Sequence, residues 1–242
     1  MRLVLVHARA SLLQLARYPT FAVPTLLFPA LLYAFFGLTQ SSARANVLMA
    51  SFAAYAVLSV AFFQFGVGIA SDRIDPWETF VRTLPVGAGV RFAARVVSAL
   101  AFAIASAAVV VTLALAATPA HLSGVEWGRF AFALLAGGVP LALLGIAVGY
   151  WVPPKAALAV ANLLYLAFAF AGGLWTGPYR LPDAVESAAP FVPTRQWGDV
   201  VWASVDGGGW GGVHWLALLA YGVLFGTFAV LGYRRDEGER FG

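Results

Sequence analysis

The 242-residue chain is 61% hydrophobic and only 11% charged, with a formal net charge of +4 at pH 7. Soluble domains carry roughly 25% charged residues, so a water-soluble fold of this length would expose apolar area that it has too little charge to cover. The composition therefore excludes an ordinary soluble protein and predicts an all-α membrane protein. The absence of cysteine excludes disulfides and thiolate metal sites.

The first segment, residues 1–18, has the pattern of an amphipathic helix. Leu3, Val6 and Leu13 fall near one helical stripe, whereas Arg9 and Arg17 lie largely elsewhere. This pattern predicts a helix that lies in the cytoplasmic membrane interface. An ordinary basic lead-in to the first membrane span is the alternative.

Six apolar stretches are long enough to cross a bilayer, for which a helix needs about 20 residues. They run approximately over residues 20–38, 47–70, 96–117, 130–150, 156–175 and 213–233, and none contains an Asp, Glu, Lys or Arg. We therefore expect residues 1–242 to form a single transmembrane domain with six transmembrane helices. The first stretch begins only near residue 20 and is long for a cleaved signal peptide, so we expect it to be retained.

The distribution of basic residues predicts the orientation in the membrane. Six spans place both termini on one side. If that side is the cytoplasm, eleven of the 15 Lys and Arg residues lie inside, as the positive-inside rule requires. Inside are Arg2, Arg9, Arg17, Arg73, Arg82, Arg91, Arg95, Lys155, Arg234, Arg235 and Arg240, and outside are Arg44, Arg129, Arg180 and Arg195. We expect a cell-membrane protein with cytoplasmic termini, whose basic loops contact lipid and not nucleic acid.

A short charged segment, residues 72–85, separates the second and third spans. Asp75 is suited to cap a helix that begins at Pro76, and Pro85 ends it. One apolar edge of this helix carries Trp77, Phe80, Val81 and Leu84, and its other face carries Asp72, Arg73, Glu78 and Arg82. Two interpretations stay open: a loop helix with a solvated charged face, and a docking element for a cytoplasmic partner.

A longer segment, residues 177–209, precedes the last span. Pro182 with Asp183 can start a helix over 184–189, and Thr194 can cap another over 195–204. Because Trp197, Trp202 and Trp210 are suited to the membrane interface, the segment is expected to form an external helical hairpin that dips towards the membrane.

Some residues within the spans concern packing. Gly145 with Gly149, and Gly173 with Gly177, form small-xxx-small pairs, which favour close helix contacts but indicate no dimer seam. Six aromatic residues are interpreted as packing or lipid-facing residues in preference to a substrate path, which the sequence leaves unidentified. They are Tyr33, Phe35, Phe36, Phe62, Phe63 and Phe65.

The sequence lacks the motifs of a self-powered transporter or an enzyme. Lys155 is the single lysine and is followed by Ala156, so the chain has no P-loop for ATP. The histidines His7, His121 and His214 are far apart and form no metal-binding pair. Charged residues are absent from the spans, which disfavours ion-coupled transport. We expect no catalytic, cofactor or metal site and no self-powered transport.

Taken together, these segments resemble the ABC-2 type transporter permeases, the membrane subunits of one class of ATP-driven exporter. Residues 75–86 (DPWETFVRTLPV) look like the family's cytoplasmic coupling-helix region, and residues 177–182 and 189–194 resemble its external region after span five. The resemblance implies a homodimer around a central path, with each copy contacting a separate cytoplasmic ATPase subunit. The implied ATPase-coupling residues are Asp72, Arg73, Asp75, Trp77, Glu78, Phe80, Arg82 and Leu84.

The resemblance further implies export of a hydrophobic or amphipathic substrate, with the short drug-efflux permeases as the favoured subgroup. Two alternatives remain. One is a haem-exporter-type permease of cytochrome maturation, which has a similar length and number of spans. The other is a non-transporting membrane module with an immunity or signalling role, which would bind no ATPase.

Overall fold

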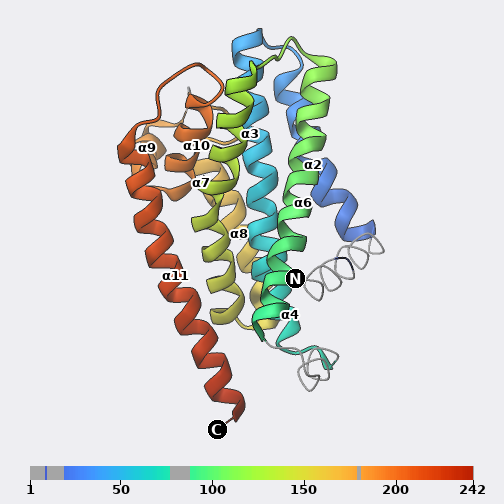
Figure 1. Cartoon of the computed structure of the whole chain (residues 1–242), viewed down its shortest axis with the longest axis vertical. Coiled ribbons are helices and arrows are strands. Elements are labelled where there is room, and N and C mark those ends of the chain that lie inside the picture. The colour runs from blue at the N-terminus through green and yellow to red at the C-terminus, as the bar shows by residue number, and fades with distance from the viewer. Residues whose placement is uncertain (1–8, 10–18, 77–87, 179–180, 242) are drawn as a thin grey trace.

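The computed structural model describes residues 9, 19–76, 88–178 and 181–241 of the chain. All regular structure in this part is helical, as Figure 1 shows, which confirms the predicted all-α class. The expected interfacial helix over 1–18, apart from Arg9, and the segment 77–87 lie outside the described residues.

The long helices follow the apolar stretches of the sequence. They are α2 (Pro19–Gly37), α3 (Ser42–Val60), the π-helix η1 (Ala61–Val67), α4 (Gly68–Asp72), α6 (Ala88–Ala117), α7 (Gly124–Trp151), α8 (Pro154–Ala171) and α11 (Gly212–Phe241). The elements α3, η1 and α4 form one continuous helix. Three short elements lie between α8 and α11: α9 (Asp183–Glu186), η2 (Ala189–Phe191) and α10 (Pro193–Ala203).

Five helices of the described residues are long and apolar enough to cross a membrane. They are Ser42–Asp72, Gly89–Ala117, Gly124–Trp151, Pro154–Ala171 and Gly212–Glu237. The first expected span, residues 20–38, coincides with α2, in which the apolar stretch Thr25–Gly37 is shorter than the other five. The helices therefore support a helical membrane protein, and the arrangement with six spans stays a prediction.

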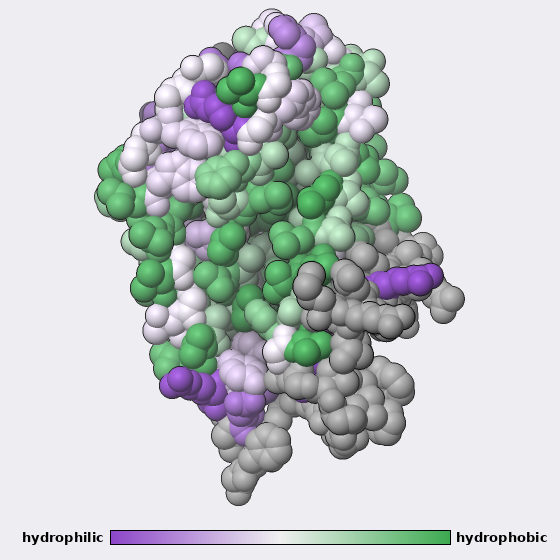
Figure 2. All heavy atoms as spheres, viewed as in Figure 1, coloured by the Kyte–Doolittle hydropathy of each residue, from purple (hydrophilic) through white to green (hydrophobic). Residues whose placement is uncertain are grey.

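The outer surface is hydrophobic along the length of the helices. Figure 2 shows apolar residues over the middle of the bundle and polar residues towards both ends. Leu163 on α8 and Leu216 and Leu219 on α11 are each exposed by two thirds or more. Between α6 and α7 the surface is hollowed into an apolar groove of about 230 Å³, with α3 and η1 at its floor. Such a surface is suited to lipid tails and not to water.

The continuous helix Ser42–Asp72 lies at the centre of the bundle, with 89% of its apolar stretch buried. The elements α2, α6, α7 and α8 pack around it, and α11 packs mainly against α7 (Figure 1). Small residues such as Ala50, Ser51 and Ala54 on α3 allow these neighbours to approach closely. A helix surrounded on all sides in this way needs little contact with lipid.

Two glycines of α7 allow its backbone to touch η1. A Cβ added to Gly149 would lie 2.9 Å from the carbonyl oxygen of Phe65, and one added to Gly145 would overlap the carbonyl oxygen of Ala61. The close packing expected for this pair is therefore present, and it joins two helices of the same chain.

The second glycine pair does not form a helix contact. Gly173 and Gly177 have φ values of +75° and +73°, a conformation that glycine adopts at little cost. The chain turns there, so α8 ends at Ala171, earlier than the expected boundary near residue 175. These glycines end the helix and redirect the chain towards α9 and α10.

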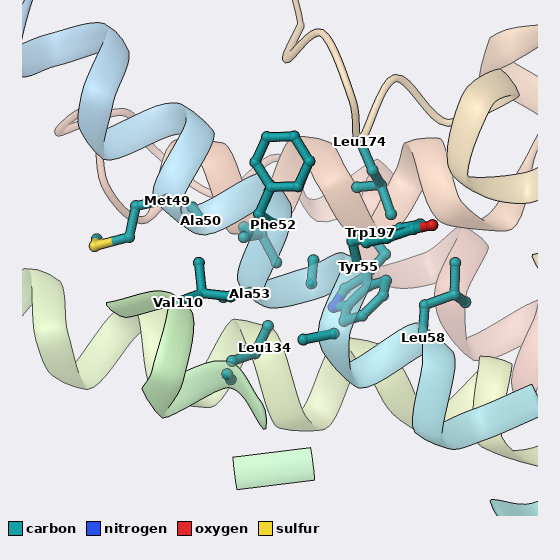
Figure 3. Packing of buried hydrophobic residues seen from close by; sticks show 14 of the residues in the cluster. Met49, Ala50, Phe52, Ala53, Tyr55, Leu58, Val110, Leu134, Leu174 and Trp197 are labelled. Atoms are coloured by element: carbon teal, nitrogen blue, oxygen red, sulfur yellow. The ribbon is translucent and has the colours of Figure 1, made fainter. Parts of the chain in front are cut away.

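The segment before α11 inserts its last helix into the bundle. Trp197 and Trp202 of α10 are buried, which corrects their expected place at the membrane interface. The Nε1 of Trp197 donates to the carbonyl oxygen of Ala133 at 3.0 Å, and that of Trp202 to the Oγ of Ser51 at 2.7 Å. Figure 3 shows Trp197 among the buried side chains of the core.

The start of α10 also differs from the expectation. The helix begins at Pro193 with Val192 as its N-cap, and Thr194 makes no cap. The Thr194 hydroxyl instead donates to the carbonyl oxygen of Phe168 at 2.6 Å and so joins α10 to the end of α8. Of the expected first helix over 184–189, only the single turn α9 forms, followed by the 3₁₀ turn η2.

Candidate functional site

The candidate site is the end of the bundle from which the segment predicted to couple to an ATPase emerges. Asp72 is the last residue of α4, Arg73 follows it, and Asp75 is exposed beyond them. The other predicted coupling residues lie outside the described residues: Trp77, Glu78, Phe80, Arg82 and Leu84. The structure therefore places three of the eight and brings the first two into contact with other helices.

Arg73 joins the ends of three helices. Its Nε donates to the Oδ1 of Asp236 on α11 at 2.8 Å. Its Nη1 donates to the carbonyl oxygens of Gly149 and Val152, at 3.3 and 3.1 Å. These carbonyls lie at the C-terminal end of α7, where a helix has unpaired acceptors and attracts positive charge. Arg73 thus donates hydrogen bonds to carbonyl oxygens at the end of α7 and also forms an ion pair with Asp236 of α11.

Asp72 makes a second connection at the same end of the bundle. Its carboxylate forms an ion pair with Arg95 of α6, and both side chains are roughly one-quarter exposed. Asp72 and Arg73, which the sequence assigns to the charged face of the segment, both bind residues of their own chain. Adjacent residues of α4 therefore connect to different helices, Asp72 to α6 and Arg73 to α7 and α11.

The end of α11 is attached to α7 by further contacts. The Nε1 of Trp151 donates to the carbonyl oxygen of Phe228 at 2.9 Å. The guanidinium of Arg235 lies 5.4 Å from the centre of the Trp151 ring, a cation–π contact. Asp236 and Arg235 belong to the charged end of the chain, and no sequence pattern there indicates a partner on α4 or α7.

A cluster of aromatic and polar side chains lies deeper in the bundle, where α8 packs against α3 and η1. The rings of Tyr55 and Tyr165 stack with centroids 4.5 Å apart, and Phe63 meets Tyr165 edge-on at 5.5 Å. The Nε2 of Gln64 is buried without a hydrogen-bond partner. An unpaired amide is costly in hydrocarbon, and π-helices such as η1 are frequent at functional sites. Gln64 is therefore a candidate for contact with a polar group of a transported molecule.

The aromatic residues singled out in the sequence are divided by the fold. Tyr33, Phe62 and Phe65 are buried in the packing between helices, whereas Phe35 and Phe36 on α2 are exposed. Phe63 alone among them contacts the cluster around Tyr165. Gln64 was not singled out, although a polar amide within an apolar stretch is a signal that the sequence contains.

The opposite end of the bundle holds α10 through polar contacts as well. His214 at the start of α11 lies 2.7 Å from the Oε1 of Gln196, measured from its Nδ1. Arg195 pairs with Asp199 one turn later at 3.0 Å, and its guanidinium lies 5.3 Å from the centre of the Trp202 ring. α10 is thus bound to α11 along one edge and buried in the bundle along the other.

Comparison with known proteins supports a role in transport. No protein-family model matches the chain, and no solved structure matches it. The chain is 25% identical over 235 residues to "Putative transport permease YvfS" of Bacillus subtilis (strain 168), a match that covers 94% of this chain and 96% of that protein. The chain is therefore similar over nearly its whole length to a transport permease, which confirms the resemblance that the order of its segments indicated.

Proposed function

We propose that the chain is the transmembrane permease subunit of an ABC exporter, which moves a hydrophobic or amphipathic, drug-like substrate out of the cell. The observation that carries this proposal is the similarity to a transport permease over 94% of the chain, in a bundle of apolar helices. Because the sequence contains no P-loop, the ATP is hydrolysed by a separate cytoplasmic ABC subunit.

The proposed orientation places both termini in the cytoplasm. The end of the bundle that holds the Arg73 site also carries Arg91, Arg95, Lys155, Arg234 and Arg235, and the opposite end carries Arg44, Arg129 and Arg195. The positive-inside rule assigns the more basic end to the cytoplasm. This orientation presents the segment over 72–84 to a cytoplasmic ATPase.

In the proposed mechanism two copies of the chain assemble around a central path. Only 22% of the apolar stretch of α8 is buried within one chain, which leaves an apolar face available to a second copy. ATP-driven closure of the ATPase shifts the population of the pair from inward-open to outward-open. Trp77 and Phe80 supply the apolar docking contact, since exposed ion pairs such as one between Glu78 and Arg82 contribute only about 0–1 kcal/mol.

Co-expression with candidate ABC ATPase subunits, especially any encoded beside the chain, tests this proposal. We expect a complex that co-purifies and hydrolyses ATP in nanodiscs, and we expect Trp77→Ala and Phe80→Ala to abolish its assembly. Retention of the ATPase by both variants would refute the docking assignment. If the wild-type chain retains no ATPase, a non-transporting immunity or signalling module becomes the better hypothesis. Co-purification of haem-handling partners would instead support a haem-exporter-type permease.

Gln64 provides a second test, directed at the substrate path. We expect Gln64→Leu to raise the drug concentration for half-maximal stimulation of the ATPase by about 10-fold, because a lost hydrogen bond to a buried group weakens binding to this degree. Complex assembly should be unchanged and thermal stability equal or higher, since Gln64 Nε2 has no partner to lose and leucine removes an unpaired amide. The matched control is Gln40→Leu, which removes an exposed amide near the end of α2. An equal effect of both variants would exclude Gln64 from the path.

A further inference from the structure

We infer that Arg73 is a positioning residue for transport: it carries the movement of the docked segment to α7 and α11 together. This inference rests on the proposed function, because it assumes that an ATPase moves the segment following α4. The proposed function assigns residues 72–84 to docking on the ATPase. The inference adds a different role for Arg73, which is to connect that segment to helices of its own chain. The three hydrogen bonds to Asp236, Gly149 and Val152 carry the inference.

The chain that leaves α4 is held by backbone hydrogen bonds through Ile74. The amide nitrogen of Arg73 donates to the carbonyl oxygen of Ile69 at 3.2 Å, and that of Ile74 donates to Ser71 at 3.1 Å. The backbone therefore continues the hydrogen-bonded end of α4 through Ile74. Asp75 follows this hydrogen-bonded turn directly, so a displacement of the chain at Asp75 is expected to move Arg73.

The connection from Arg73 to the other helices is also strong. The side chains of Arg73 and Asp236 are 18% and 8% exposed, so the ion pair is largely shielded from solvent. Breaking a buried pair leaves an uncompensated charge, which is far more costly than breaking an exposed pair. Arg73 and Asp236 are therefore expected to move as a unit.

Through Asp72 and Arg73, a movement of α4 reaches two different groups of helices. Asp72 is bound to α6 through Arg95, whereas Arg73 is bound to α7 and to α11. Since these residues are neighbours at one helix end, a rotation of α4 changes the position of α6 relative to the pair of α7 and α11. Relative movement of these groups is the kind of change that opens and closes a path between helices.

A distance measurement in the nanodisc complex tests the inference. Because the chain has no cysteine, spin labels at Phe92→Cys on α6 and Leu231→Cys on α11 are the only labels on one copy, and both positions are exposed. The labelled chain is assembled with an excess of unlabelled chain, so that one copy of each pair carries the labels. We expect ATP to change the distance between them in the otherwise wild-type complex. In Arg73→Gln we expect this change to be lost and drug-stimulated ATPase activity to fall about 10-fold, in the range of typical coupling energies, with the ATPase still bound.

Two further variants separate coupling from folding. Arg73→Lys, which keeps a positive side chain able to donate to Asp236 and to the carbonyl oxygens of α7, is expected to retain more of the ATP-dependent change in distance than Arg73→Gln, and Arg234→Gln, an exposed neighbour on α11, is expected to leave it intact. A full change in distance in Arg73→Gln would overturn the inference, as would a loss in Arg73→Lys as severe as in Arg73→Gln with both proteins stably folded. A wild-type complex that fails to assemble would instead refute the proposed function on which the inference rests.

Discussion

Replacing Gly145 by alanine is expected to destabilise the bundle by about 3 kcal/mol or more, at the upper end of the cost of overpacking a core. The added Cβ would overlap the carbonyl oxygen of Ala61 and lie 2.8 Å from its carbonyl carbon. Ala61 belongs to η1 at the centre of the bundle, where neighbours on several sides prevent the backbone from moving away. The clash is with main chain, so no change of rotamer relieves it.

Thermal unfolding of the purified protein in detergent measures this effect. A loss of 3 kcal/mol corresponds to a fall in Tm of roughly 6–12 °C for a chain of this size. The matched control is Gly226→Ala on α11, where the nearest atom to the added Cβ is Leu143 Cδ1 at 3.6 Å. Alanine favours a helix over glycine by about 1 kcal/mol, so the control is expected to be neutral or slightly stabilising. Equal behaviour of the two variants would contradict the contact between α7 and η1.

The sequence predicted the long helices well, because each contains an apolar stretch of about the length that a membrane-crossing helix needs. Several of these helices begin before the apolar stretch that predicted them. Helix α6 begins at Ala88, ahead of the expected residue 96, and α7 begins at Gly124, ahead of residue 130. Hydropathy detects only the part of a helix that matches hydrocarbon, and these first turns carry charged residues such as Arg95 and Glu126.

One of these starts had a readable signal. Ser123 and Glu126 form a capping box, in which the Oε2 of Glu126 accepts from the amide nitrogen of Ser123 at 2.7 Å. A serine followed three residues later by glutamate is a sequence signature of a helix start. The span was predicted from hydropathy alone, and hydropathy does not detect a capping box.

The contacts of the candidate site could not be predicted in the same way. Arg73 and Asp236 are 163 residues apart, and nothing local to either residue indicates the other. A charged residue beside a span fits a solvated loop, a docking face and an ion pair between helix ends equally well. Only the packing of α4, α7 and α11 selects the third of these.

The burial of the tryptophans of α10 could not be predicted from the local sequence either. Trp197 and Trp202 belong to a helix with charged residues, a composition that suits a membrane interface. Their depth is decided by the residues opposite them, and Gly137 on α7 leaves the space that the Trp197 ring occupies. Pairing a large residue with a glycine about 60 positions earlier requires knowledge of the fold.

Replacing Trp197 by alanine is expected to release α10 from the bundle. The side chain is fully buried, and its Nε1 hydrogen bond to Ala133 joins α10 to α7. Truncation of a buried tryptophan costs about 3–5 kcal/mol. The remaining helices contact one another without α10, so we expect local detachment of α10 rather than unfolding of the whole bundle.

Labelling of a single introduced cysteine detects this detachment. Val201 on α10 is buried, so Val201→Cys is expected to resist a membrane-impermeant maleimide in the otherwise wild-type protein and to react when Trp197→Ala is added. Trp197→Phe keeps most of the buried ring but loses the hydrogen bond, so its labelling should be intermediate. Phe191→Ala removes an exposed aromatic from the same segment and should leave the cysteine protected. Protection of Val201→Cys in the Trp197→Ala protein would mean that the polar contacts of Gln196 and Arg195 suffice to hold α10, and the assigned role of the tryptophan would be wrong.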